Sequence, residues 1–103
     1  MVRRQAKSPK TNIIKRKLFE TFRYKYGLGV LLHKFRKETG KVRFTYEDFI
    51  SWYMKNWWRF HKRPLSTQTI GRALRLFAEL NFVIERIYRK GRKVVFTFWR
   101  YKH

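Results

Sequence analysis

The sequence predicts an α+β fold, with helices over most of the chain and a β-hairpin at its C-terminal end. Three observations support this class. Apolar residues recur at helical spacing between residues 12 and 80, and a short stretch near residue 42 alternates polar and apolar side chains. After residue 81 the chain is rich in β-branched and aromatic residues. With 103 residues, 44% of them hydrophobic, the chain is long enough for one domain with a single core.

Two helices are predicted before residue 40. The first runs from residue 12 to Gly27, a plausible C-cap, and its apolar side chains are Ile13, Ile14, Leu18, Phe19 and Phe22. The second closes at Thr39-Gly40, and its repeating apolar residues are Leu28, Leu31, Leu32 and Phe35. Residues 27–29 form either a break between two helices or a kink in one longer helix. The extra N-terminal helix is expected either to cover the core or to pair with a second copy of the chain.

A short edge strand is predicted at residues 41–44, where it can pair with the C-terminal hairpin. Thr45 then suits the N-cap of a third helix, because Glu47 and Asp48 place carboxylates at the positive helix end. The residues expected to share its apolar face are Tyr46, Phe49, Ile50, Tyr53 and Trp57. Trp52 and Trp58 fall elsewhere and are expected to be partly exposed. Residues 59–64 form the connecting turn.

The helix with the clearest start signal is predicted from Thr67 to Leu80. Ser66 is a good N-cap residue, and Ile70 can pack against Leu65 as a hydrophobic staple. The expected buried stripe consists of Ile70, Ala73, Leu74, Phe77 and Leu80. The opposite face carries Gln68, Gly71, Arg72 and Arg75. It is therefore polar, cationic and flat at Gly71, which suits close approach to a nucleic-acid groove, where Arg reads guanine and Gln reads adenine.

Two strands follow, at residues 82–88 and 94–99, and the run Arg89-Lys90-Gly91-Arg92-Lys93 between them supplies a turn with a cationic tip. A helix followed at once by a basic hairpin resembles the winged helix-turn-helix family over about residues 28–100. The resemblance implies a winged helix-turn-helix fold with an extra N-terminal helix and with the C-terminal β-hairpin as the wing. It is similar in style and composition to the small winged-helix proteins of archaeal viruses and plasmids.

The family resemblance implies a division of roles. Residues 12–103 would form the winged-helix domain, with a recognition helix at about 67–80 in the major groove and a wing at about 86–95 on an adjacent groove or the phosphate backbone. The residues expected to contact DNA from the recognition helix are Ser66, Thr67, Gln68, Thr69, Arg72 and Arg75. Those expected from the wing are Arg89, Lys90, Arg92 and Lys93. Gln68 and Arg72 are the choice for base contacts. An ordinary solvated surface is the alternative for each set.

The charge balance indicates a polyanionic partner. Against 27 Lys and Arg residues stand 6 Asp and Glu residues, giving a net charge of +21 that self-repels unless an anion neutralises it. Residues 1–11 form a flexible basic arm in which Arg3, Arg4, Lys7 and Lys10 can track phosphates, with a solvated tail as the alternative. No apolar run is long enough to cross a membrane and no signal peptide begins the chain, so we expect a cytoplasmic location, at a nucleoid or in a host cytoplasm.

Other chemistry has little support in the sequence. The chain lacks cysteine, and His33, His61 and His103 show no ligand spacing, so neither a metal nor a cofactor is expected. Glu47 and Asp48 are explained by helix capping, and no nucleophile or phosphate-binding glycine loop is visible, so we expect no enzyme. Aromatic rings that could stack on bases are Tyr24, Tyr26, Trp52, Trp57 and Trp58. A homodimer contact, by the N-terminal helix or around Trp52 and Trp58, is the preferred explanation of the surplus.

The leading hypothesis is therefore a sequence-specific double-stranded DNA-binding protein that acts as a transcriptional regulator. One alternative is an RNA-binding or ribosome-associated winged helix, because several ribosomal proteins share that fold and its basicity. The other is an architectural or replication-initiation protein that binds DNA with little sequence preference.

Overall fold

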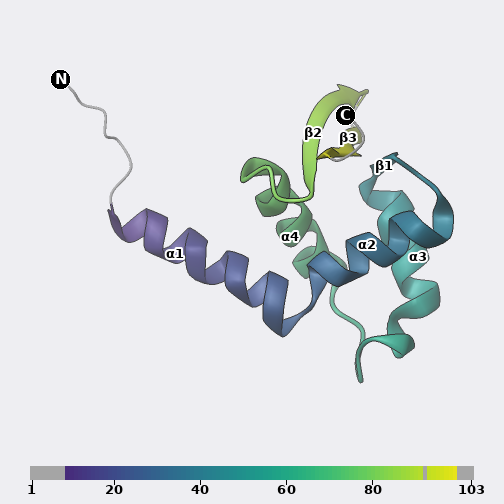
Figure 1. Cartoon of the computed structure of the whole chain (residues 1–103), viewed down its shortest axis with the longest axis horizontal. Coiled ribbons are helices and arrows are strands. Elements are labelled where there is room, and N and C mark those ends of the chain that lie inside the picture. Colours follow the sequence, from purple (N-terminus) through teal and green to yellow (C-terminus); the bar gives the residue numbers. More distant parts are fainter. Residues whose placement is uncertain (1–8, 92, 100–103) are drawn as a thin grey trace.

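The described part of the chain, residues 9–91 and 93–99, folds in the computed structural model into four α-helices and one three-stranded antiparallel sheet. This confirms the α+β class. The helices are α1 (Pro9–Glu20), α2 (Leu28–Thr39), α3 (Tyr46–Asn56) and α4 (Thr67–Glu79). The strands are β1 (Arg43–Thr45), β2 (Ile84–Lys90) and β3 (Lys93–Phe98). Figure 1 shows that α1 extends beyond the rest of the fold, whereas the other helices lie against the sheet.

Helix α1 begins at Pro9, earlier than the predicted start at residue 12, because proline fits the first turn of a helix. Lys10, which the sequence assigns to the flexible arm, therefore lies within α1. After Glu20 the helix widens into one π-helical turn, η1 (Thr21–Lys25), after which the Tyr26 N–H donates to the Thr21 carbonyl at 3.0 Å. Gly27 has a φ of 64° and separates η1 from α2, so residues 27–29 contain a break.

Among the side chains of α1 and η1 that the structure describes, those that cover the core lie in the last turn of α1 and in η1. Phe22 is buried, and the Phe19 ring meets the rings of Phe77 and Phe82 edge-on. The exposed large apolar side chains of α1 are Ile13 (53%), Ile14 (53%) and Leu18 (46%). They are exposed because α1 runs past the end of the core (Figure 1).

Helix α2 has the predicted bounds at its start and end, and its apolar residues Leu28, Leu31, Leu32 and Phe35 are all buried. Its Phe35 ring is the centre of an aromatic cluster. The ring centroids of Phe44, Phe49 and Trp52 lie 5.1, 5.3 and 5.6 Å from that of Phe35. The expected partial exposure of Trp52 is therefore wrong, because Phe35 extends the core to the flank of α3. Trp58 is 66% exposed, as predicted.

Helix α3 begins with the predicted cap. The Thr45 hydroxyl accepts from the Asp48 N–H at 3.3 Å, and the Asp48 carboxylate accepts from the Thr45 N–H at 2.9 Å. The strand before it is Arg43–Thr45 and not residues 41–44. It pairs with β3, as expected, and the strand order is β1-β3-β2. In this register Phe44 lies opposite Phe96, and both rings face the helices and join the core.

Helix α4 also follows its sequence signals. The Ser66 hydroxyl accepts from the Thr69 N–H at 3.0 Å, and the side chains buried as predicted are Ile70, Ala73, Leu74 and Phe77. Leu80 was expected in the same stripe but is 44% exposed, because the helix ends at Glu79. Leu76 and Ala78 are buried in addition, since the C-terminal half of α4 is packed on two sides.

Candidate nucleic-acid interface

The exposed side of α4 brings three of the predicted contact residues together. Gln68, Arg72 and Arg75 follow one another at spacings of four and three, so they lie on one side of adjacent turns. All three side chains are exposed. Within the described residues, neither guanidinium takes part in a hydrogen bond or ion pair. This side of α4 therefore presents an amide and two cations that are available to a ligand.

The first turn of α4 offers hydroxyl groups, but capping already uses part of them. The Ser66 hydroxyl accepts from the Thr69 N–H and donates to Thr69 Oγ1 at 2.9 Å. Thr69 is half-buried, whereas Thr67 and Gln68 are exposed. Of the four predicted residues around the cap, Thr67 and Gln68 are therefore the most available for contact.

Gly71 does not provide the flat outer surface that the sequence suggested. It is half-buried, and a Cβ atom added there would lie 3.8 Å from Cε1 of Tyr46. The Tyr46 ring also meets the Phe96 ring edge-on, with centroids 5.2 Å apart. The space beside Gly71 is thus bordered by a tyrosine ring from α3, which fills the angle between α4 and β3.

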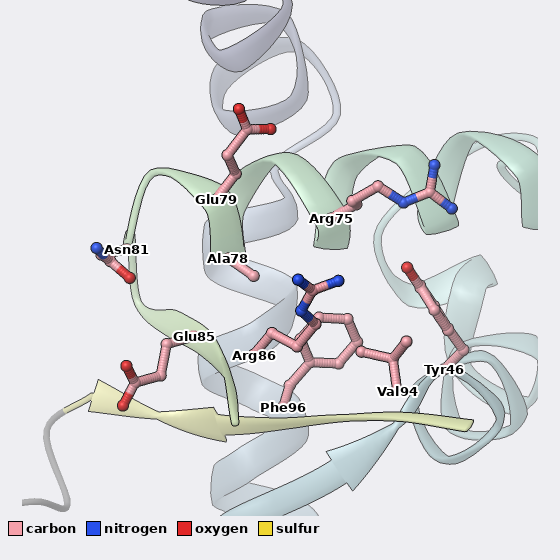
Figure 2. Close-up of a pocket in the computed structure, with 9 residues that line it drawn as sticks. All are labelled: Tyr46, Arg75, Ala78, Glu79, Asn81, Glu85, Arg86, Val94 and Phe96. Atoms are coloured by element: carbon pink, nitrogen blue, oxygen red, sulfur yellow. The ribbon is translucent and has the colours of Figure 1, made fainter. Parts of the chain in front are cut away.

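A crevice of about 400 Å³ lies between α4 and the β2–β3 hairpin. Figure 2 shows the guanidinium groups of Arg75, from α4, and Arg86, from β2, on either side of the Tyr46 hydroxyl. Val94 and Phe96 form the apolar floor below them. Two cationic side chains and a phenol hydroxyl therefore border one hollow.

The sequence predicts that the wing begins near residue 86, but neither Arg86 nor Tyr46 is among the predicted contact residues. The only signal for Arg86 is a cation that interrupts the apolar residues of its strand, which does not say on which face it lies. Tyr46 was assigned to an apolar helix face, and its hydroxyl position depends on the packing of that face against β3. Both roles follow from the tertiary arrangement.

Acidic groups near the crevice are engaged elsewhere. Glu79 forms an ion pair with Lys15 of α1, and in Figure 2 its carboxylate points away from Arg75 and Arg86. Glu85 likewise points away from the two guanidinium groups. Neither carboxylate therefore neutralises the convergent cations.

The predicted wing is only partly described at the level of side chains. The hairpin turns at Gly91, which has a φ of 65°, and Lys93 is exposed at the start of β3. The backbones of Arg89 and Lys90 belong to β2, while their side chains lie outside the described part of the structure, as does Arg92 entirely. The arm residues Arg3, Arg4 and Lys7 also lie outside it. The side chain of Lys10 is not described, although its backbone lies in α1.

No protein-family model, curated protein or solved structure matches this chain. Over residues 9–91 and 93–99, no group of three or more His, Asp and Glu residues is arranged to hold a metal ion. None of the helices described has the length and apolar character needed to cross a bilayer. The proposed function is therefore argued from the exposed cations on and beside α4, which are Arg72, Arg75 and Arg86.

Proposed function

We propose that this protein is a sequence-specific double-stranded DNA-binding protein of the winged helix-turn-helix type that acts as a transcriptional regulator. Helix α4 would enter the major groove, while the β2–β3 hairpin and the N-terminal arm would contact flanking phosphates. The observation that supports this is the exposed side of α4, where Gln68, Arg72 and Arg75 lie together in a chain of net charge +21. The packing of the opposite side of α4 against the core supports its use as a rigid reading element.

Base reading is assigned to Gln68 and Arg72. A bidentate Arg contact to guanine or a Gln contact to adenine discriminates against the wrong base by about 1–3 kcal/mol. Phosphate contacts from the remaining cations would add affinity without sequence preference. The two groups of residues therefore predict different binding phenotypes.

RNA binding is the second candidate function, and one observation favours it. The rings of Tyr24 and Trp58 are 68% and 66% exposed, so both could stack on unpaired bases. Trp52 is buried and is not available for stacking. Competition of labelled duplex DNA by structured RNA separates the two functions. An RNA-binding protein would release the labelled duplex at a lower concentration of RNA than of unlabelled duplex.

Selection of bound sequences from a random duplex pool tests the DNA proposal. A defined consensus is the expected result. A plot of log affinity against log salt concentration should fall with a slope of about 0.9 for each phosphate that the protein neutralises. Binding to duplex without a consensus, with spreading footprints, would instead support an architectural or replication-initiation role. Failure to retain any duplex would contradict DNA binding itself.

The proposal includes a homodimer, which is supported by the exposed apolar side chains Ile13, Ile14 and Leu18 on α1. A two-fold symmetric dimer would read two half-sites about 34 Å apart, so its consensus should be palindromic. The mass of the protein and of its DNA complex, measured in the selection buffer, tests this. A monomer bound to a single half-site would contradict the dimer.

A further inference from the structure

We propose that the crevice between α4 and the hairpin binds one backbone phosphate of DNA, held jointly by Arg75, Arg86 and the hydroxyl of Tyr46. This inference rests on the proposed function. It assigns Arg75 to phosphate rather than base contact, and it adds Arg86 and Tyr46, which are not among the individual contact residues predicted from the sequence.

The register of the sheet places Arg86 on the correct face. Arg86 of β2 lies opposite Phe96 of β3, and Phe96 lies opposite Phe44 of β1. Residues that are directly paired across strands point to the same side of a sheet. Because the Phe44 and Phe96 rings belong to the core, Arg86 must lie on the side that faces the helices. It is nevertheless exposed, because β2 is an edge strand.

Tyr46 supplies a donor in a fixed position. Its ring is half-buried between the backbone at Gly71 and the ring of Phe96. The hydroxyl has no hydrogen-bond partner among the described residues, and Figure 2 shows it between the two guanidinium groups. The packing of the ring therefore fixes the position of the hydroxyl at the crevice, where it can donate a hydrogen bond.

The donor set matches a phosphodiester. Two guanidinium groups that border one hollow attract an anion, which also reduces the repulsion between them. Guanidinium groups bind phosphate oxygens through parallel hydrogen bonds, and a hydroxyl can donate to a further oxygen. Among the described residues that line the crevice, the two carboxylates, those of Glu79 and Glu85, point away from both guanidinium groups. The site can thus accept an anion with several oxygen atoms.

The position of the crevice identifies that anion as part of DNA. Arg75 follows Arg72 by three residues on the exposed side of α4, so the crevice lies next to the side chains assigned to base reading. A strand that borders the major groove would pass over this point. One phosphate held by both α4 and β2 would fix the depth and register of α4 in the groove, which is the usual role of backbone contacts.

Salt-dependent binding of the full chain tests the shared site. Affinities are measured by fluorescence anisotropy over a series of NaCl concentrations, with a labelled duplex that carries the selected sequence and a scrambled duplex of equal composition. The variants are Arg75→Gln, Arg86→Gln, the double variant and Tyr46→Phe. The matched control is Arg43→Gln, because Arg43 is an exposed arginine on β1, the opposite edge of the sheet from β2.

The double variant should lower the salt slope by about 0.9, the value for one phosphate, which corresponds to about eightfold weaker binding at 0.1 M NaCl. The loss should be equal on both duplexes. Tyr46→Phe should weaken binding severalfold without changing the slope, because it removes no charge. Arg43→Gln should leave the slope unchanged. Circular dichroism confirms that each variant is folded, and Arg75→Lys and Arg86→Lys, which keep the charge, should retain the slope with lower affinity.

Three results would overturn the proposal. A slope reduced by about 1.8 in the double variant would mean that the two arginines hold separate phosphates. An unchanged slope, with wild-type binding intact, would remove the phosphate site but leave the DNA-binding function standing. If the wild-type chain binds no duplex at any salt concentration, both the phosphate site and the proposed function are wrong.

Discussion

The hydroxyl of Tyr53 on α3 lies 2.8 Å from Nδ1 of His61, in the connection that leads to α4. His61 Nε2 lies 2.9 Å from the carbonyl oxygen of Tyr26, which can only accept, so Nε2 carries a hydrogen, and in the neutral imidazole Nδ1 accepts from the tyrosine hydroxyl. The same hydroxyl accepts from the Leu65 N–H at 2.9 Å. These bonds join the end of η1, α3 and the residue before the Ser66 cap, and thereby fix the start of α4.

Replacing Tyr53 with phenylalanine should therefore destabilise the fold. The variant leaves the Leu65 N–H and His61 Nδ1 without their partner, and an unsatisfied buried polar group costs about 1–3 kcal/mol. Burial also raises the pKa of the Tyr53 hydroxyl, as expected for a group removed from water. Urea denaturation measures the free energy of unfolding. The control Tyr24→Phe removes an exposed hydroxyl and should change it by less than about 0.5 kcal/mol; equal losses in the two variants would contradict the buried network.

Acid stability should depend on Glu38. Its carboxylate accepts from Arg59 at 2.9 and 2.7 Å and from the Trp52 indole at 3.2 Å, and these bonds, chiefly those from Arg59, hold the pKa of the Glu38 carboxyl below its ordinary value of 4.5. A carboxyl whose pKa is lowered on folding stabilises the protein above the unfolded-state pKa, and this contribution disappears as the pH falls through the folded-state pKa.

The comparison of wild type with Glu38→Gln isolates that contribution. Wild type should have the higher Tm at neutral pH, and the two Tm values should converge as the pH falls below 4.5, the ordinary glutamate pKa, and through the lower folded-state pKa of Glu38. Thermal unfolding followed by circular dichroism over a pH series measures the difference. A difference that stays constant from neutral to acidic pH would show that ionisation of Glu38 does not contribute.

Phe35→Ala should be among the most damaging single substitutions. The Phe35 side chain is fully buried and contacts three other aromatic rings, so its truncation leaves a cavity and should cost about 3–5 kcal/mol. Ile14→Ala, at a side chain that is 53% exposed, should cost much less. The free energies of unfolding from urea titrations check both values. A large loss in Ile14→Ala at low protein concentration would contradict the exposed position of α1.

The elements of this fold were predictable where local signals coincide. Helix α2 has strong periodicity between two glycines, and Ser66 and Thr45 mark the starts of α4 and α3. Periodicity also identified which side chains share a face. It could not indicate where the core ends, so Leu80 was wrongly expected to be buried, and Trp52 was wrongly expected to be partly exposed. Burial at the margins of a helix depends on the neighbours that tertiary packing brings there.

The candidate site divides in the same way. The shared exposed side of Gln68, Arg72 and Arg75 is a property of one helix and follows from its spacing. The crevice required the register of β2 against β3 for Arg86 and the packing of α3 against β3 for Tyr46. Neither relationship is local in sequence, so no pattern of residue types could reveal it.

The roles assigned to α4 and to the hairpin predict different effects on sequence preference. Arg72→Ala and Gln68→Ala should lower the ratio of affinities for the selected and scrambled duplexes, because each lost base contact is worth about 1–3 kcal/mol of discrimination. Lys93→Ala removes an exposed cation at the start of β3 and should weaken both duplexes by the same factor. Its salt slope should fall by about 0.9, as for the loss of one phosphate contact.

Anisotropy titrations on the two duplexes at one salt concentration measure the ratio directly, and the salt series measures the slope. Arg72→Ala and Lys93→Ala remove equal charge, so they are matched for the general electrostatic attraction of a chain with 27 basic residues. Only a base contact changes the ratio. If Arg72→Ala, Gln68→Ala and Lys93→Ala all lose the same factor on both duplexes, the residues assigned to base reading on α4 do not read the sequence, and DNA binding by this protein would then rest on backbone contacts.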